Sequence, residues 1–355
     1  MLSDVEVLAQ LAQLEDQNTG QAYGPVWQVL ADEKRLHIRL ELAYAALGDT
    51  AELEQRIATL LNDGRQVVLD IHMSIQAHGT QAELPGLKGV KNVIAVASGK
   101  GGVGKSTTTV NLALAMAKEG ARVGILDADI YGPSQGMMMG FAPDTRPNVR
   151  DEKFFVPPMA HGIQVMSMAF LTTQDTPMAW RGPMVTGALM QIINQTDWDD
   201  LDYLFIDMPP GTGDIQLTLS QKVPVAGSVI VTTPQDIALL DARRGIEMFN
   251  KVNIPVLGVV ENMSVHICSN CGHHEAIFGD EGGDSLAKEY GVDVMGKLPL
   301  SLAIRQQCDS GNPSVADDAN SEVARIYRAI ARKIGAGLAL KENQFSMPNI
   351  GMSDD

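Results

Sequence analysis

The sequence is poor in cysteine, in aromatic side chains and in positive charge. Three cysteines in 355 residues are too few for a disulfide scaffold, which favours a reducing, cytoplasmic setting. The formal net charge of −16 argues against nucleic acid or an anionic membrane as the main partner, because both attract basic surfaces. The sequence also lacks an apolar run of about 18 residues and a charged-then-apolar N-terminal segment, so we expect neither a membrane span nor a signal peptide.

Enough apolar material is present for two domains, since 45% of the residues are hydrophobic. Residues 1–75 predict a small α/β unit of amphipathic helices and alternating strands. Its expected helices are 5–14 and 51–61, and its expected strands are 26–30, 36–42 and 67–75. The polar, glycine-rich stretch 76–90 predicts a linker. The polar tail, residues 341–355, predicts disorder.

Residues 91–340 predict a larger domain built from short apolar strands separated by helical patterns. Continuous apolar strands of this kind are typical of a mostly parallel sheet covered by helices on both faces. The expected strands are 93–97, 122–126, 164–168, 203–206, 228–232, 256–260 and 294–298. The predicted fold class is therefore α/β, with ligands bound at the carboxyl ends of the strands.

A complete phosphate-binding loop, G-x-x-x-x-G-K-[ST], follows the first of these strands. A helix-compatible stretch from Thr107 to Glu119 comes next, and Gly120 is suited to cap its end. In such a loop, backbone N–H groups hold phosphates, Lys105 neutralises the β and γ phosphates, and the Ser106 hydroxyl ligates Mg²⁺. The residues predicted to bind a nucleoside triphosphate here are Gly99, Lys100, Gly101, Gly102, Val103, Gly104, Lys105, Ser106 and Thr107.

Three further polar segments follow predicted strands and are expected beside the loop. The first contains Asp127 and Asp129, two carboxylates suited to positioning water or organising Mg²⁺. The second begins with Asp207 in a Walker B position and includes Gly211, whose N–H is suited to the γ-phosphate. In the third, the Asn262 amide is able to donate and accept toward a purine edge. Aspartate is also common at helix caps, but together with the loop these segments predict one site.

A second chemical signal is the pair Cys268 and Cys271, whose C-x₂-C spacing places two thiolates close enough for one metal centre. Three completions stay open. The pair recruits histidines of its own chain for zinc, it is a redox couple, or two chains each contribute one pair to a shared iron–sulfur cluster. The histidines nearby are His266, His273 and His274. The third cysteine, Cys308, is expected to be a packed core residue.

The phosphate loop, with Lys100 directly after its first glycine, resembles the deviant Walker A loop of the MinD/ParA ATPases. Residues 90–335 as a whole resemble the Mrp/ApbC branch of this group, whose members are iron–sulfur cluster carrier ATPases. The resemblance rests on the loop together with segments 127–134 and 207–214 and the C-x₂-C pair. The resemblance implies a P-loop NTPase fold that binds ATP and works as a homodimer. The small unit 1–75 is similar in layout to the domain that often precedes this ATPase. We expect it to serve as a docking or stabilising module.

The resemblance also implies a role for each site residue. Its implied catalytic residues are Lys100, Lys105 and Asp129. Lys100 reaches the partner subunit's phosphates, and Asp129 positions the hydrolytic water. The remaining implied roles are Mg²⁺ binding by Ser106, Asp127 and Asp207, adenine contact by Asn262 and Pro299, and a bridging 4Fe–4S cluster on Cys268 and Cys271.

The leading hypothesis is an ATP-binding carrier that hydrolyses ATP slowly and delivers a cluster from an assembly scaffold to apoproteins. Two alternatives remain open from the sequence. One is a positioning ATPase acting on membrane or DNA, which needs a basic surface or helix that this acidic chain lacks. The other is a P-loop ATPase whose C-x₂-C pair holds structural zinc at a dimer interface.

Overall fold

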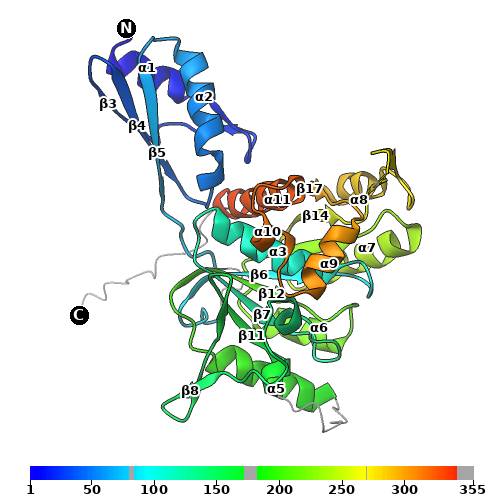
Figure 1. Ribbon diagram of the computed structural model, residues 1–355. Coiled ribbons are helices and arrows are strands. Elements are labelled where there is room, and N and C mark those ends of the chain that lie inside the picture. The colour runs from blue at the N-terminus through cyan, green and yellow to red at the C-terminus, as the bar shows by residue number, and fades with distance from the viewer. Residues whose placement is uncertain (80–83, 172–181, 269, 342–355) are drawn as a thin grey trace, which may run out of the picture.

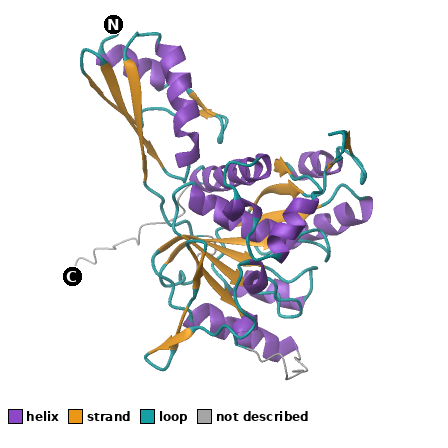
Figure 2. Cartoon of the chain, viewed as in Figure 1, coloured by secondary structure: helices purple, strands orange, loops and turns teal. Residues whose placement is uncertain are grey.

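The computed structural model describes residues 1–79, 84–171, 182–268 and 270–341, and shows a smaller N-terminal part and a larger α/β part (Figure 1). Figure 2 shows that each part has its own sheet and its own helices. The tail predicted to be disordered lies, from residue 342 on, outside the described residues. Among the helices that are described, none is long and apolar enough to cross a lipid bilayer.

The larger part is built on an eight-stranded sheet with the order β10-β11-β7-β12-β6-β13-β14-β17. All neighbouring strands in it are parallel except the short edge strand β10. The strands are β6 (Val90–Ala97), β7 (Val123–Asp127), β10 (Met159–Ala160), β11 (Ile163–Ser167), β12 (Leu201–Asp207), β13 (Gly227–Thr232), β14 (Val256–Glu261) and β17 (Asp293–Lys297). The seven strands expected from apolar runs are all present, and the α/β fold class is confirmed.

Helices cover both faces of this sheet, as Figure 1 shows with α3 and α11 above it and α5 and α6 below it. The helices are α3 (Lys105–Lys118), α4 (Gln135–Met138), α5 (Gly182–Gln195), α6 (Asp214–Lys222), α7 (Asp236–Lys251), α8 (Gly282–Tyr290), α9 (Leu302–Asp309), α10 (Ser314–Asp317) and α11 (Glu322–Ala339). Every residue of β7, β11, β12 and β13 is buried, which explains why their sequences are mostly apolar.

The N-terminal part packs two helices on one face of a three-stranded sheet. In β4 burial alternates along the whole strand, because successive side chains point to opposite faces of a sheet. Val7 from α1 and Ile57 from α2 join Leu36, Ile38 and Leu40 in one buried cluster. The elements are α1 (Asp4–Leu11), β1 (Glu15–Asp16), β2 (Gln21–Ala22), β3 (Trp27–Ala31), β4 (Arg35–Leu42), the 3-10 turn Leu47–Asp49, α2 (Thr50–Leu61) and β5 (Gln66–Met73).

Several two- or three-residue strands have no clear sequence signal, because a period of two cannot be recognised over so few residues. They form the hairpin of β8 (Asn148–Arg150) with β9 (Phe154–Val156), and the hairpin of β15 (His266–Ile267) with β16 (His274–Glu275). A 3-10 turn, Met168–Phe170, follows β11. The second of these hairpins carries the cysteine pair.

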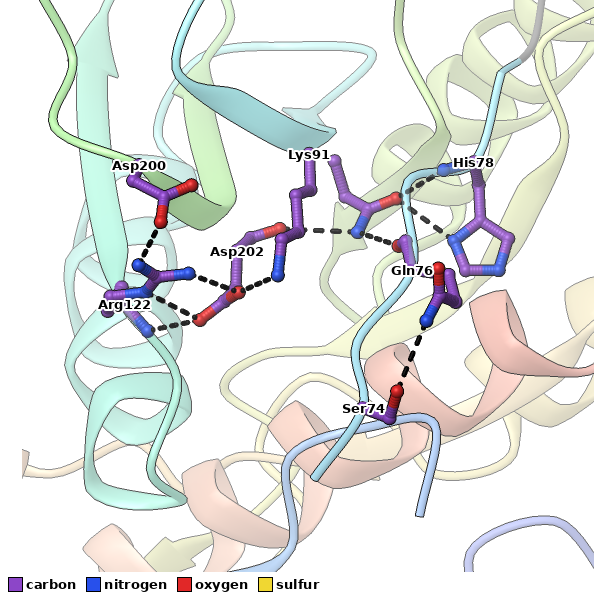
Figure 3. Close-up of polar contacts among 8 residues, drawn as sticks. Ser74, Gln76, His78, Lys91, Arg122, Asp200 and Asp202 are labelled. Carbon is purple, nitrogen blue, oxygen red and sulfur yellow. Dashed lines mark hydrogen bonds and ion pairs between the residues drawn. The ribbon is translucent and has the colours of Figure 1, made fainter. Parts of the chain in front are cut away.

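The stretch after β5 is fastened to the start of the central strand. The Asn92 side chain donates to the carbonyl of Gln76 at 2.8 Å and accepts from the backbone N–H of His78 at 3.0 Å (Figure 3). Beside it, Asp202 accepts hydrogen bonds from Lys91 and Arg122. These contacts lie where the parallel strands begin. Asn92 therefore holds Gln76 and His78 at the end of the sheet opposite the phosphate loop.

A buried ion-pair network joins the N-terminal part to the helix that follows the phosphate loop. Glu119, directly after α3, is fully buried and accepts from Arg328 at 2.7 Å and from Arg332 at 3.0 Å. Its other oxygen accepts the backbone N–H of Gly48 at 2.7 Å. Arg332 also pairs with Asp49 at 2.9 Å. Glu119 therefore links α3 and α11 to the turn before α2.

Candidate functional site

The phosphate loop connects the central strand β6 to helix α3. Gly102 and Gly104 have left-handed backbone angles of +84° and +81°, which favour glycine. A Cβ on Gly104 would clash with the amide nitrogen of Asn262, so this position also needs glycine for space. The Ser98 hydroxyl donates to the Lys100 carbonyl at 2.9 Å. The loop is therefore held in shape by its own glycines and by contacts from the strands around it.

Lys105 and Asp207 form a buried ion pair at the start of α3. Asp207 ends β12, the strand beside β6, and is fully buried. The carboxylate oxygen that contacts Lys105 also accepts from the Thr109 hydroxyl at 3.2 Å, and the other oxygen accepts from the Gln135 amide at 2.8 Å. The Lys105 ammonium also lies 3.3 Å from the Ser106 hydroxyl. Residues 105, 106 and 207, predicted to act together, are therefore brought together.

Asp127 ends β7 and lies directly opposite Asp207 in the sheet register. Its carboxylate is fully buried and accepts the backbone N–H groups of Ser134 and Gln135, at 2.9 Å and 3.0 Å, and the hydroxyl of Ser167 at 3.2 Å. Burial, together with the negative charge of Asp207, raises the pKa of Asp127 to about 7. The carboxylate predicted to organise Mg²⁺ thus shapes the loop after β7 in this structure, and its metal role stays a prediction.

Asp129 lies two residues further along the same loop and is less enclosed. Its backbone N–H donates to Asp127 at 3.2 Å. Burial raises the pKa of its carboxyl group, and the nearby Lys105 opposes that shift. The predicted role of Asp129 in positioning the hydrolytic water stays a prediction.

Three residues outside the phosphate loop, Asn262, Gly211 and Pro299, are also predicted to contact the nucleotide. The Asn262 amide is buried and donates to the Val103 carbonyl at 2.9 Å, so it contacts the phosphate loop itself. The Gly211 N–H donates to the Ser98 carbonyl at 3.0 Å and is thereby engaged within the protein. Pro299 is buried just beyond β17. The adenine contacts of Asn262 and Pro299 and the phosphate contact of Gly211 stay predictions.

Cys268 and Cys271 lie on the short hairpin between β15 and β16. The Cys268 N–H donates to the His273 carbonyl at 2.9 Å, and the Gly272 N–H donates to the Cys268 carbonyl at 2.9 Å. Hydrogen bonding from the backbone N–H groups of Cys271 and Asn270 lowers the pKa of the Cys268 thiol. Cys268 is half-buried and Cys271 is exposed, so the pair is open to an incoming group.

The histidines considered as further ligands, His266, His273 and His274, lie on the same hairpin as the cysteines. Across the part of the chain that the structure describes, no three His, Cys, Asp or Glu side chains are arranged to hold a metal ion. The three completions of this cysteine pair, zinc with nearby histidines, a redox couple and a cluster shared by two chains, stay predictions. Cys308 lies elsewhere, on α9 beside Asn111 of α3, where burial raises the pKa of its thiol to about 11.

Sequence reasoning missed Gln135, Thr109 and Ser167, each of which holds one of the buried aspartates. Gln135 lies one residue beyond the Asp127–Ser134 segment, so a longer reading of that segment would have included it. Thr109 lies four residues after Lys105, one turn along the same helix, and this spacing is a usable signal. Ser167 has no such signal, because only the sheet order places it beside Asp127.

The central strand of the parallel sheet leads through the phosphate loop into a helix, and aspartates end two neighbouring strands. These features define a P-loop NTPase of the MinD/ParA type. The family model described as ParA, NUBPL iron-transfer P-loop NTPase, matches residues 89–335. The chain belongs to this family. The family likeness expected from the sequence is thereby confirmed.

Two relatives and one solved structure illustrate the match. An iron-sulfur cluster carrier protein of Pseudomonas fragi is 68% identical over 270 residues, which are 76% of this chain and 94% of that protein. A protein of the same name from Escherichia coli K12 is 53% identical over 306 residues, covering 85% of this chain and 83% of that protein. A nucleotide-binding protein of Archaeoglobus fulgidus, solved in complex with ADP, is 36% identical with a TM-score of 0.58, covering 66% of this chain and 91% of that chain.

Proposed function

We propose that this chain is an ATPase that carries an iron–sulfur cluster and passes it to apoproteins, after loading from an assembly scaffold. Membership of the iron-transfer family and the names of its relatives support this role over that of a positioning ATPase. The observation that carries the proposal is the accessible cysteine pair on a hairpin that follows Asn262 by a few residues. The proposal includes a reducing, cytoplasmic compartment, because three cysteines are too few for a disulfide scaffold.

The residues around the phosphate loop fit Mg²⁺ and a nucleoside triphosphate. Mg²⁺ prefers oxygen ligands, and Ser106, Asp207 and Asp127 supply a hydroxyl and two carboxylates at the ends of adjoining elements. When bound, Mg²⁺ neutralises the charge of the phosphates. Lys105 leaves Asp207 to contact the β and γ phosphates, and Asp129 positions the attacking water. Hydrolysis is slow, because segments 99–107, 127–134 and 207–214 supply carboxylates to position water but no arginine to stabilise the developing charge.

The cluster is a cargo held between two subunits. One hairpin supplies two thiolates, while a 4Fe–4S cluster needs four protein ligands, so two copies of the hairpin complete the set. The lowered pKa of Cys268 favours the thiolate that binds iron. Lys100 lies on the phosphate loop of each subunit and reaches the partner's phosphates, so the same dimer holds ATP and cluster.

ATP couples to the cluster through the segment that joins the two sites. Asn262 contacts the phosphate loop at Val103, and β15 begins only a few residues later at His266. Between them, the Ser264 N–H donates to the Leu298 carbonyl at 3.0 Å and the Leu300 N–H to the Val265 carbonyl at 2.8 Å, which ties this segment to β17 and the turn after it. A change in the loop on binding ATP is therefore transmitted toward the cysteines, which biases loading and release.

Anaerobic reconstitution with iron and sulfide tests this function. The wild-type protein should take up a 4Fe–4S cluster per dimer, with a broad visible absorption band that is lost on exposure to air. Cys268→Ala and Cys271→Ala should each abolish uptake, whereas Cys308→Ala should retain it, because Cys308 is buried away from the hairpin. Zinc in place of iron, or uptake that survives both hairpin substitutions, would refute the carrier function.

A further inference from the structure

Gln135 contacts three separate parts of the nucleotide site. It is fully buried at the first position of α4. Its side-chain amide donates to Asp207 at 2.8 Å and to the Ser106 carbonyl at 3.0 Å, and its backbone N–H donates to Asp127 at 3.0 Å. One residue therefore joins the loop after β7 to the phosphate loop and to the end of β12.

The orientation of the Gln135 amide follows from these partners. The Ser106 carbonyl and the Asp207 carboxylate are both acceptors, so the group that faces them is the donating nitrogen. The amide oxygen is buried and has no hydrogen-bond partner among the residues that the structure describes. A buried carbonyl oxygen without a partner is unfavourable and is uncommon in a native protein. A donor that arrives with the substrate, such as a water molecule bound to Mg²⁺, would satisfy it.

Asp207 divides its two oxygens between different kinds of partner. One oxygen contacts Lys105 and the Thr109 hydroxyl, and the other contacts Gln135. Once Lys105 turns to the phosphates, the first oxygen loses its cation and keeps the Thr109 hydroxyl, and the Gln135 contact to the other oxygen remains. A neutral amide is suited to this task, since it holds a carboxylate without competing with a cation for its charge.

We infer that Gln135 is a positioning residue for ATP hydrolysis, which keeps Asp207 and Ser106 aligned for Mg²⁺ and ties them to the loop that begins at Asp127. The inference rests on the proposed ATPase function. Gln135 acts by holding Asp207 and Ser106 in place. Its loss should therefore weaken nucleotide binding that depends on Mg²⁺ and leave binding without Mg²⁺ nearly unchanged.

Two substitutions at position 135 test this role. Gln135→Met keeps the length of the side chain but removes both hydrogen bonds of the amide. Gln135→Glu adds a third carboxyl group beside Asp127 and Asp207. The matched control is Gln164→Met, because Gln164 is also a buried glutamine that contacts a backbone, at the start of β11 away from the phosphate loop.

The measurement is binding of a fluorescent ATP analogue by the full chain, in EDTA and across a Mg²⁺ titration, with ATP hydrolysis followed in parallel. Gln135→Met should bind the analogue in EDTA within about twofold of wild type and need about tenfold more Mg²⁺ for half-saturation, the effect of losing one hydrogen bond to a charged group. Gln135→Glu should need more Mg²⁺ than wild type as well, and Gln164→Met should match wild type.

The other possible outcomes contradict either the proposed ATPase function or the inference about Gln135. Wild-type protein that binds no nucleotide would refute the proposed ATPase function itself. Wild-type binding together with an unchanged Mg²⁺ requirement in both Gln135 variants would overturn only the inference. Loss of binding in EDTA as well as in Mg²⁺, or an equal change in Gln164→Met, would show a purely structural role and overturn it too.

Discussion

Lys105 and Asp207 form a buried ion pair that joins the phosphate loop to the end of the neighbouring strand β12. In this arrangement the lysine that should contact phosphates is held by the carboxylate that should organise Mg²⁺. Under the proposed function, binding of MgATP breaks this pair and gives each of the two residues a new partner. Both ATP binding and the stability of the fold should therefore respond to the loss of Lys105.

Lys105→Met should weaken ATP binding roughly tenfold to a hundredfold, since a hydrogen bond to a charged group is worth about 1.5–3 kcal/mol. It should also destabilise the fold by about 3 kcal/mol or more, because Asp207 is left buried without its cation. Isothermal titration with ATP and denaturant unfolding measure the two effects. Lys91→Met is the control: it removes a partly exposed ion pair with Asp202, which retains Arg122, and should leave ATP binding unchanged.

The stability of the protein should depend on pH through Asp127. Burial and Asp207 raise the pKa of Asp127 from 3.8 to about 7 in the folded state. The unfolded state releases this proton first as pH rises, so the contribution of Asp127 to the free energy of unfolding falls from about pH 4 to pH 7 and is constant above it. The slope approaches about 1.4 kcal/mol per pH unit for one proton.

Comparison with Asp127→Asn isolates this contribution, because the variant has no proton to lose at that position. The stability of wild type relative to Asp127→Asn should fall as pH rises from about 5 to about 7. Unfolding curves in urea at several pH values provide the measurement. Parallel pH profiles for the two proteins would show that Asp127 has an ordinary pKa in the folded state.

Cys268 and Cys308 should differ in their reactivity toward iodoacetamide at neutral pH. Backbone N–H groups lower the pKa of the accessible Cys268, so it should react readily. Burial raises the pKa of the Cys308 thiol from 9.0 to about 11, which lowers its thiolate fraction roughly a hundredfold. Mass spectrometry of peptides after timed labelling measures the order. Equal labelling of Cys308 and Cys268 in the native protein would contradict it, and equal labelling in denaturant is the control.

Glu119→Ala should destabilise the protein by about 3 kcal/mol or more, because it leaves Arg328 and Arg332 without their buried partner. Arg305→Ala is the matched control, since it removes an exposed ion pair with Asp309 and should cost less than about 1 kcal/mol. Urea unfolding measures both. Equal effects of the two substitutions would show that the junction between α3, α11 and the N-terminal part contributes little.

Much of the larger part follows from the sequence, because strands buried on both faces are continuous apolar runs and ligands gather at their carboxyl ends. The phosphate loop, Asp127 and Asp207 can all be located in this way. The divisions at residues 75, 90 and 340 stay predictions. The three-stranded sheet does lie before residue 76, while β6 already begins at Val90, at the last residue of the predicted linker.

Contacts between elements distant in the chain could not be predicted. Whether Asp127 faces a metal or the backbone of its own loop depends on how residues 128–135 fold around it. From the sequence, Glu119 is an ordinary charged residue at a helix end. In the structure, α11 and the turn before α2 enclose it. The residue type of Asn262 predicts only that its amide could contact a purine. The structure shows its contact with the Val103 carbonyl.

The most direct test of the carrier function is transfer of the cluster to an apoprotein. Anaerobically reconstituted wild-type protein is mixed, with and without MgATP, with an apo-enzyme whose activity returns when it receives a 4Fe–4S cluster. We expect recovery of activity with wild type and with Cys308→Ala, a rate that changes with MgATP, and no recovery above free iron and sulfide with Cys268→Ala or Cys271→Ala. Equal recovery with the hairpin variants, or none with wild type, would contradict the claim that this chain carries a cluster on Cys268 and Cys271.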